Sequence, residues 1–339
     1  MTSGNVAVLY SAEAIHNPEL NTTIIALSYT DPSDPARNLL AEIAPELGSN
    51  FYRLKTGEHE LLFWEQEKLK VRGHTGNFVL WPFPNRVRDK QYTYRGQHYT
   101  FDGVPRHQGP LIHGLVFDRP WDYEPPQADE QGASVTTYIE ANPETPYFSA
   151  YPFLSRLALT YTLTSAGITI TYTVSNKDTQ PLPYGFALHP YFHLLAEPEK
   201  TLVSLPAAHV MEADKELLPT GRLLDVDSVM YAMFDLNQFS QVSHLKLDHV
   251  YTSRPAANEA LIEHCVQQLR LRITASADFT HAVIYTLGDG PFFCLENQTC
   301  STDAINLFQN DQQDIAHLLE VQPGEEASGF IRYTVEYYS

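Results

Sequence analysis

The sequence predicts an all-β protein built as a large, mostly antiparallel β-sandwich. Apolar and polar residues alternate with a period of two in several segments, whereas helical periodicity is scarce. The 23 prolines and 17 glycines are spread along the chain, as expected for many short strands joined by turns. No repeat of about 20–50 residues is present, which excludes propellers and solenoids.

The clearest strands form a hairpin. Apolar residues occupy alternate positions of 157–163 and of 168–174, with mainly threonines between them, and Ser165-Ala166-Gly167 separates the two runs. This pattern predicts two antiparallel strands with one apolar and one Thr-rich face. The same alternation predicts further strands at 269–273 and 331–337.

Helices and linkers are minor features of the sequence. Residues 311–320 (DQQDIAHLLE) and 235–244 have patterns that fit short helices, too short to form layers. The most linker-like stretch, 123–132 (YEPPQADEQG), is polar, acidic and only about ten residues long. We interpret it as a surface loop, so the sequence predicts a single domain spanning 1–339.

Composition excludes several functional classes. The chain of 339 residues has 22 Lys+Arg against 41 Asp+Glu, a net charge of −19, and 43% hydrophobic residues. The apolar content excludes global disorder. The charge argues against a nucleic acid or an anionic membrane surface as a partner, and it disfavours a phosphorylated substrate unless a basic pocket is present. No apolar run approaches the roughly 18 residues of a membrane span.

The cysteines and the first residues suggest a compartment. Cys265, Cys294 and Cys300 are too few for a disulfide scaffold, and there is no CxxC motif. The start, MTSGN, lacks the basic and apolar regions of a signal peptide. We therefore expect a soluble, cytoplasmic protein.

Common phosphate, nucleophile and zinc motifs are absent: there is no GxGxxG, GxxxxGK[ST], GxSxG or HExxH. His189 and His193 are four residues apart in HPYFH, but Pro190 and the following aromatic pair favour an extended segment. In a strand this spacing is about 13 Å, too far for two ligands of one ion. We expect neither a metal nor a cofactor.

Three segments place ionisable groups within an aromatic, apolar frame. They are 76–88 with 109–114, then 184–194, and 291–299. A buried ionisable group must be paired or hydrogen-bonded, so we expect these segments to meet in one cleft.

Taken singly, the residues of these segments are ambiguous. His113 and His189 could be core histidines, and Arg86 beside Asn85 could belong to a surface turn. Glu296 is the strongest candidate, because the apolar residues before it should desolvate the carboxylate and raise its pKa.

Ordered motifs resemble the aldose 1-epimerase (galactose mutarotase) family from about residue 40 to the C-terminus. They are Pro84-Asn85-Arg86, Ile112-His113-Gly114, His189-Pro190-Tyr191-Phe192, Leu247-Asp248-His249-Val250-Tyr251, Cys294-Leu295-Glu296-Asn297-Gln298-Thr299 and Pro323-Gly324-Glu325. Two positions depart from the family pattern. His193 stands where Asn is common, and Asn297 stands where Pro often follows the glutamate, and we expect both to alter the lining near the site.

The resemblance implies a galactose mutarotase-like β-supersandwich with a sugar in an open cleft. It implies that the protein interconverts the α and β anomers of a free aldose such as galactose or glucose. By position, His189 would be the general acid, Glu296 the general base and His113 a second active-site histidine. Arg86 and Asp248 would hold sugar hydroxyls.

This chemistry needs one acid and one base and no cofactor. The C1 hydroxyl loses a proton while the ring oxygen gains one, and each group contributes about 10²–10⁴ in rate. We expect Glu296 and Asp248 to raise the pKa of His189 and keep it protonated. Asn85 would join Arg86 and Asp248 in binding hydroxyls, and aromatic faces for the sugar ring would come from Trp81, Phe83, Tyr191 and Phe192.

Three alternatives stay open. A hexose-6-phosphate 1-epimerase would need a basic pocket, to which Arg86, Arg88 and Arg106 could contribute. A non-catalytic sugar-binding protein could use the same fold. A glycoside hydrolase could use Asp248 and Glu296 as its two carboxylates. For the activity that the resemblance implies, the expected partner is a small-molecule aldose, and we expect the chain to be a monomer or a weak homodimer.

Overall fold

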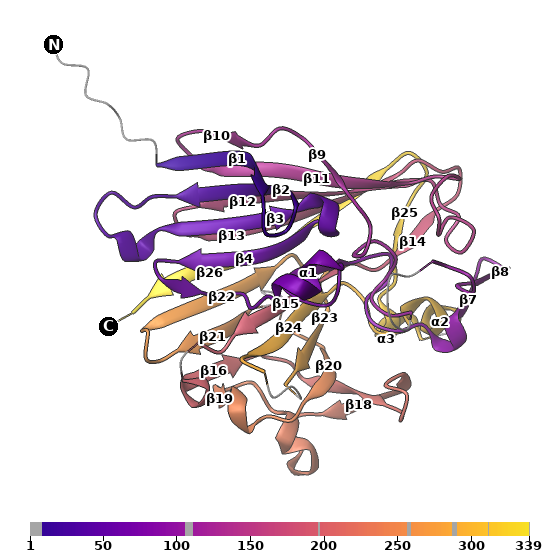
Figure 1. The fold of residues 1–339 in the computed structure, drawn as a ribbon. Helices are drawn as coiled ribbons and strands as arrows, with labels where there is room; N and C mark the ends of the chain where they lie inside the picture. Colours follow the sequence, from indigo (N-terminus) through magenta and orange to yellow (C-terminus); the bar gives the residue numbers. More distant parts are fainter. Residues whose placement is uncertain are drawn as a thin grey trace.

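The computed structural model describes residues 9–105, 111–195, 197–255, 259–286, 290–310 and 312–338. Antiparallel strands dominate this part of the chain, and its helices are short (Figure 1). The predicted all-β fold class is therefore confirmed. None of the helices in these ranges combines the length and the apolar character that crossing a membrane requires.

The N-terminal sheet follows the order of the chain. Across the described residues its five strands are β1 (Tyr10–Asn17), β2 (Thr22–Tyr29), β3 (Leu39–Ala44), β4 (Asn50–Thr56) and β5 (His59–Glu60). Residues 10–29, part of the N-terminal stretch that carries no recognisable motif, thus contribute the edge of this sheet.

The largest sheet mixes distant parts of the chain. Among the described residues it has ten strands, with β9 (Asp122–Tyr123) paired to β11 off the main path. The others lie in the order β10 (Gln127–Ala128), β11 (Ala133–Ala141), β12 (Ser155–Thr164), β13 (Gly167–Asn176), β26 (Glu326–Tyr337), β22 (Leu269–Ala275), β21 (Ala260–His264), β16 (Thr201–Ser204) and β19 (Ser240–Gln241).

A third sheet of seven strands, counted over the same residues, lies beside the first. Its order is β18 (Pro219–Asp225), β17 (His209–Ala213), β20 (Asp248–Thr252), β23 (His281–Tyr285), β24 (Phe292–Gln298), β15 (Ala187–His193) and β6 (Asn77–Leu80). Two small pairs complete the strands: β7 (Gln91–Tyr94) with β8 (Gln97–Thr100), and β14 (Leu182–Tyr184) with β25 (Leu319–Val321).

The helices of the described chain are connectors. The α-helices are α1 (Gln66–Lys70), α2 (Ala304–Gln309) and α3 (Gln313–Ala316). The 3₁₀ segments are η1 (Pro35–Arg37), η2 (Pro45–Leu47), η3 (Arg88–Lys90), η4 (Pro198–Lys200), η5 (Val229–Phe234) and η6 (Val242–His244).

The predicted strands are present. The hairpin forms as β12 and β13, joined where Thr164 pairs with Gly167, and its alternating apolar residues are buried. The runs at 269–273 and 331–337 lie in β22 and β26, which pair with each other. The linker-like stretch carries β10 and the end of β9, both paired to β11.

The helix predictions are less successful. Residues 235–244 form no α-helix: Asp235 Oδ1 instead accepts a hydrogen bond from the backbone N–H of Asn237, a local turn that competes with helix formation. Within 311–320, only α3 is helical among the described residues, and Asp311 lies outside them. His317 ends the helix with a left-handed φ of 48°, and β25 follows.

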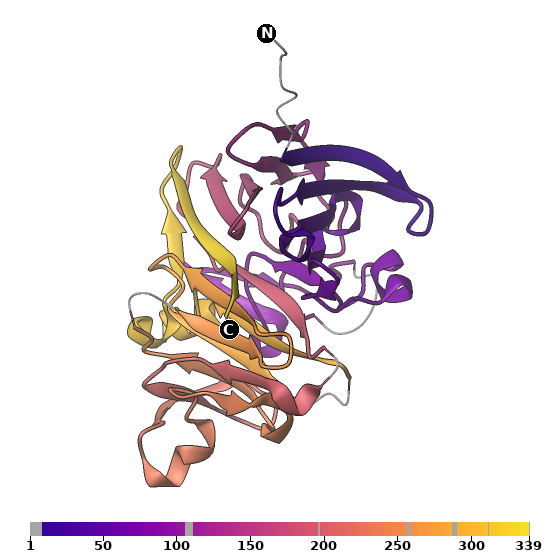
Figure 2. The same cartoon turned by 90° about the vertical axis from the view of Figure 1, so that its left-hand side faces the viewer.

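The core joins the three large sheets. Tyr333 on β26 is a stacked neighbour of Phe51 on β4, with ring centroids 6.5 Å apart, and an edge-to-face neighbour of Phe192 on β15, at 5.7 Å. Tyr333 thus packs the ten-stranded sheet against both the five-stranded and the seven-stranded sheet. Figure 2 shows the N-terminal strands at one end of the molecule and the segment around β17 and β18 at the other.

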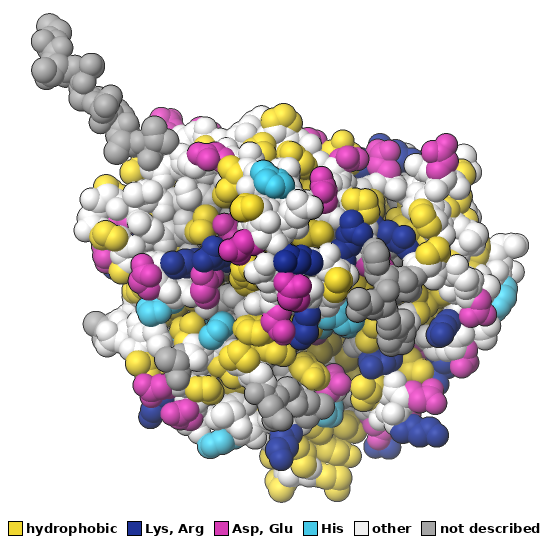
Figure 3. All heavy atoms as spheres, viewed as in Figure 1, with side chains coloured by type: hydrophobic (Ala, Val, Ile, Leu, Met, Phe, Trp, Pro, Cys, Tyr) yellow, Lys and Arg dark blue, Asp and Glu magenta, His cyan; other side chains and the backbone are white. Residues whose placement is uncertain are grey.

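The surface has no single charge character on the face drawn in Figure 3. Acidic and basic side chains are interspersed there, and hydrophobic side chains gather toward the lower end of the view. The most exposed large hydrophobic residues belong to η5: Val229, Met230 and Met233.

Candidate active site

The segments 76–88, 184–194 and 291–299 meet in the seven-stranded sheet as β6, β15 and β24, and residues 111–114 join them through a bridge from Gly114 to Trp81. Residues 109–110 lie outside the described residues. β15 pairs with β24 on one side and with β6 on the other. Their register pairs Ala187 with Gln298 and Tyr191 with Cys294, which puts His189 directly opposite Glu296. Side chains opposite each other on antiparallel strands share one face of the sheet, so the fold itself brings the two groups together.

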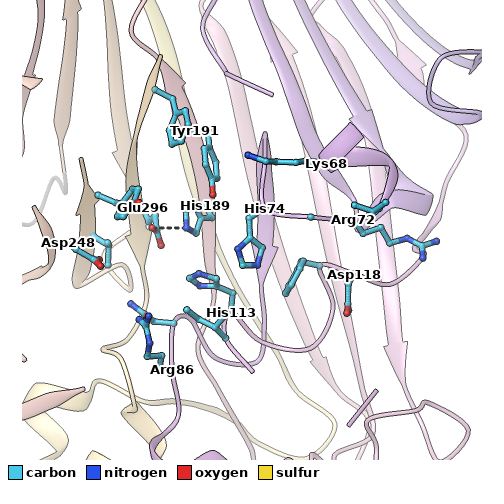
Figure 4. Close-up of a pocket in the computed structure, with 18 residues that line it drawn as sticks. Lys68, Arg72, His74, Arg86, His113, Asp118, His189, Tyr191, Asp248 and Glu296 are labelled. Carbon is cyan, nitrogen blue, oxygen red and sulfur yellow. Dashed lines mark hydrogen bonds and ion pairs between the residues drawn. The ribbon is translucent and has the colours of Figure 1, made fainter. Parts of the chain in front are cut away.

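A cleft of about 600 Å³ opens over this face, and all seven predicted site residues line it: Asn85, Arg86, His113, His189, Tyr191, Asp248 and Glu296. Figure 4 shows His189 and Glu296 in contact at its centre, with His113 and Arg86 directed toward the same space. The rest of the lining is Lys68, Val71, Arg72, Gly73, His74, Ile112, Phe117, Asp118, Val283, Tyr285 and Phe292.

Strand alternation decides which aromatic rings reach the cleft. On β15, His189 and Tyr191 face it, whereas Phe192 points into the main core. The expectation that Trp81, Phe83 and Phe192 would face a sugar is wrong, because all three are buried in that core. Besides the motif residues His113, His189 and Tyr191, the aromatic side chains of the cleft are His74, Phe117, Tyr285 and Phe292, none of which belongs to a family motif.

The central contact joins Nε2 of His189 to Oε1 of Glu296 at 3.2 Å. Both side chains are buried. Rings frame the imidazole: Phe78 stacks on it with centroids 4.6 Å apart, and Tyr191 stacks at 5.1 Å. The other carboxylate oxygen, Oε2, accepts a hydrogen bond of 3.0 Å from Nε2 of Gln298.

Burial controls the protonation of this pair. Desolvation raises the pKa of Glu296 to about 8, with a smaller contribution from Asp248 and with the Gln298 hydrogen bond opposing it. Desolvation also lowers the pKa of His189 to about 3, helped by the neighbouring His74. The expectation that the carboxylates raise the pKa of His189 is therefore wrong, because burial of the imidazole is the largest cause of its shift and lowers the pKa. Burial thus favours the uncharged forms of both Glu296 and His189 near neutral pH.

His113 reaches the cleft from a tightly built turn. Its own φ is 65°, and its backbone N–H donates to Asn85 O at 2.8 Å. Gly114 has a φ of 77° and lies against the backbone of Trp81, whose carbonyl oxygen accepts from the N–H of Leu115 at 2.6 Å. The backbone thus fixes both His113 and Asn85, and the ring of His113 lies 4.9 Å from that of His189.

Asp248 and Arg86 form the polar end of the cleft (Figure 4). Burial raises the pKa of Asp248, while the positive charge of Arg86 opposes that rise. One guanidinium nitrogen of Arg86, Nη1, donates to Oδ1 of Asn85 at 3.0 Å. This arrangement presents donors and acceptors suited to hydroxyl groups.

The sequence did not reveal a further group on the α1 side. His74 stacks on Phe78 at 5.0 Å and meets His113 edge-on at 5.3 Å, so three imidazoles surround one space. Lys68 and Arg72 also line this side, although Figure 4 shows the guanidinium of Arg72 directed away from the pair. No recognised motif contains these residues, and only their position before the 76–88 segment could have indicated them.

The two departures from the family pattern do not line the cleft, contrary to expectation. His193 lies at the end of β15, where its Nδ1 accepts from the backbone N–H of Leu195 at 2.7 Å. Asn297 points to the opposite face of β24 from Glu296, and its Oδ1 accepts from Nη1 of Arg254 at 2.5 Å.

The residues considered for a phosphate pocket are dispersed. Arg88 lies in a separate hollow with Asp303, to which its guanidinium is ion-paired at 3.7 Å. Arg106 lies outside the described residues. The extended spacing predicted for His189 and His193 is confirmed by β15, and within the described ranges no group of three or more His, Cys, Asp or Glu side chains could hold a metal ion.

The chain is similar to known proteins in sequence and in fold. The sequence pattern of the aldose 1-epimerase family matches residues 36–334. The chain belongs to the aldose 1-epimerase family. It is also similar to YihR, an uncharacterized protein of Escherichia coli K12, with 30% identity over 221 residues that cover 64% of this chain and 67% of YihR.

Solved structures share the fold of this aldose 1-epimerase family member. A galactose mutarotase-like protein from Clostridium acetobutylicum matches with a TM-score of 0.83 and 20% identity, covering 98% of this chain and 99% of its own. A putative aldose 1-epimerase from Escherichia coli K12 matches with a TM-score of 0.71 and 19% identity, covering 88% and 96%. The galactose mutarotase-like fold is thus confirmed, and the family supports a mutarotase-like isomerase activity.

The turn that carries His113 can be tested through Gly114. In Gly114→Ala, a Cβ would collide with the Trp81 backbone at a φ that L-residues rarely adopt, so we expect a loss of several kcal/mol in the free energy of unfolding. Gly96→Ala is the control, because Gly96 has a similar φ of 79° with no atom within 4 Å, and should cost only about 1 kcal/mol. Urea unfolding measures both, and equal costs would contradict this packing.

Proposed function

We propose that the protein is an aldose 1-epimerase that interconverts the α and β anomers of a free aldose such as galactose or glucose. The observation that carries the proposal is the buried contact between His189 and Glu296 at the centre of a sugar-sized cleft. The family match supports the reaction type, and the cleft supports a small polar ring as ligand.

The reaction needs an acid and a base close together. The C1 hydroxyl oxygen and the ring oxygen are bonded to the same carbon, so one group can serve each oxygen while the two groups touch each other. In our proposal Glu296 accepts the proton of the C1 hydroxyl, and His189 donates a proton to the ring oxygen. The ring opens to the aldehyde, the C1–C2 bond rotates, and closure on the other face reverses both transfers.

One shared proton is sufficient for this cycle. In the resting site Glu296 holds the proton and His189 is neutral. Moving that proton across the 3.2 Å contact gives the carboxylate and the imidazolium that the roles require. The net charge of the buried pair stays at zero throughout, so the low-dielectric site never contains an isolated charge.

The remaining residues orient the sugar. Asn85, Arg86 and Asp248 would bind hydroxyl groups at one end of the cleft, and His113 would bind one beside the pair. Tyr191, which lines the cleft next to His189, would add an aromatic contact to the sugar ring. No step of this cycle calls for a cofactor, because it moves only protons.

Substitution of the pair tests the roles. We expect Glu296→Gln and His189→Asn each to lower kcat by at least about 10², because each removes one proton-transfer group. Polarimetry on fresh α-D-glucose and α-D-galactose measures the rate of relaxation to the anomeric equilibrium. The matched control is Glu58→Gln, because the Glu58 side chain is exposed and does not line the cleft. This variant should retain full activity. Near-wild-type turnover by Glu296→Gln would contradict the assignment.

Between pH 5 and 9 the activity should fall only on the alkaline side. The pKa of Glu296 in the unliganded site is raised to about 8, so above that pH the pair loses its proton and kcat/KM should fall. The pKa of His189 is lowered to about 3, so no loss is expected between pH 7 and pH 5. Initial rates measured from pH 5 to 9 test this, and an acid limb near pH 6 would contradict it.

The buried carboxyl should also reduce stability at neutral pH. In the unfolded chain a glutamate ionises near 4.5, whereas Glu296 in the folded protein stays protonated up to about 8. The free energy of unfolding is therefore not reduced by Glu296 below about pH 4.5. It falls as the pH rises from about 4.5 to about 8, where the folded carboxyl group also ionises. Glu296→Gln removes this loss.

We therefore expect Glu296→Gln to raise Tm by at least about 2 °C at pH 7, with a gap that widens toward pH 8. Calorimetry at pH 5, 7 and 8 provides the measurement, again with Glu58→Gln as control. A variant less stable than wild type at pH 8 would show that Glu296 does not carry this penalty.

A further inference from the structure

Gln298 is the second partner of Glu296, and neither the family motifs nor the mechanism above gives it a role. The two residues lie two positions apart on β24, so their side chains share the face that carries the cleft. Gln298 is buried, and its Nε2 donates to Oε2 of Glu296 at 3.0 Å. Each carboxyl oxygen of Glu296 therefore has its own partner, with His189 on Oε1 and Gln298 on Oε2.

This pairing fixes the orientation of the carboxyl group. A donor on Oε2 restrains rotation about the last side-chain bond of Glu296, so that Oε1 remains directed at His189. A hydrogen bond to a carboxylate also stabilises its ionised form. An amide donor suits this purpose, because it has no charge and does not titrate.

Packing alone does not explain a glutamine at position 298. Its own Oε1 is buried and has no hydrogen-bond partner in the described structure. An unsatisfied buried acceptor costs about 1–3 kcal/mol, and an apolar residue of similar shape would avoid this cost. The amide at position 298 is therefore better explained by its contact with Glu296 than by the stability of the sheet.

We propose that Gln298 is a positioning residue that keeps the Glu296 carboxyl group directed at His189 and favours the ionised form of that carboxyl group. The proposal rests on the proposed function, because it assigns Gln298 to the same acid–base pair. Loss of the amide should leave Glu296 free to rotate and less acidic, which slows the proton transfers while the sugar-binding end of the cleft is unchanged.

Other titratable and charged groups also face Glu296 and Gln298 and must be considered in any test based on pH. They are His189 and Tyr191 from β15, Asp248 from β20, His281 and Tyr285 from β23, Cys294 from β24 itself, and Arg86 from the turn before η3. Burial raises the pKa of Glu296 to about 8, and the amide of Gln298 is the group that most strongly opposes this rise. A substitution at 298 changes this contact without changing the charge of any of these groups.

The test is Gln298→Met, which keeps the length of the side chain and removes the donor. The matched control is Gln241→Met, because Gln241 donates to a backbone oxygen, Glu199 O, at 2.9 Å and lies outside the cleft. Two readouts are compared with wild type: kcat and KM by polarimetry, and the titration midpoint of Glu296 by NMR of protein with ¹³C-labelled glutamate side chains. Glu296→Gln identifies the resonance.

For Gln298→Met we expect kcat to fall about tenfold, KM to change less than threefold and Tm not to fall. The Glu296 midpoint should rise by about one pH unit, which corresponds to one lost hydrogen bond to a charged group. The control should match wild type in every readout.

An unchanged midpoint in Gln298→Met would overturn the proposal, whatever happens to kcat, because a structural role alone would leave the acidity of Glu296 untouched. A raised midpoint with unchanged kcat would also overturn it, since the orientation of Glu296 would then not matter for turnover. Wild type that accelerates no sugar while the midpoint still shifts would refute the proposed function and leave the influence of Gln298 on Glu296 standing.

Discussion

The contact between His189 and Glu296 in a dehydrated site is the constraint on which the rest of the cleft depends. Isolated charges are costly in such surroundings, so the pair is stable only when its net charge is zero. Phe78 and Tyr191 exclude water from the imidazole, and Gln298 occupies the second carboxyl oxygen. Burial therefore determines which groups of the site are protonated, and the neighbouring groups only modify this.

The fold supplies this contact through register. β15 and β24 are separated by about a hundred residues in sequence, yet their pairing puts His189 opposite Glu296 on one face of the sheet. β20 and β23 continue that face and bring Asp248 to its edge. The turn at His113 and Gly114 closes the cleft from the opposite side, held by backbone contacts to Trp81. A site built mainly on strands can keep its groups in place before a ligand arrives.

Much of this arrangement could be predicted from the sequence, for physical reasons. Alternation with a period of two depends only on which face is buried, so β12, β13, β22 and β26 were recognisable directly. Ionisable residues inside apolar segments marked the strands of the site, because such groups need partners. Family motifs then predicted which residues meet.

Other features depended on three-dimensional context. The turn around Asp235 uses a local side-chain hydrogen bond that a helical pattern does not reveal. Which side of β15 faces solvent decides that Tyr191, and not Phe192, lines the cleft. The direction of the pKa shift of His189 depends on how deeply the imidazole is buried, which its sequence neighbours do not reveal. His74 and Gln298 gain their importance only from their neighbours in space.

The most direct test of the shared-proton account is a double-mutant cycle. Exchange NMR on an equilibrated aldose gives the rate of α–β interconversion for wild type, Glu296→Gln, His189→Asn and the double variant. If the two groups act as one unit, the double variant loses about as much rate as either single variant, because each single change already disables the pair. Independent losses that multiply in the double variant would contradict the account.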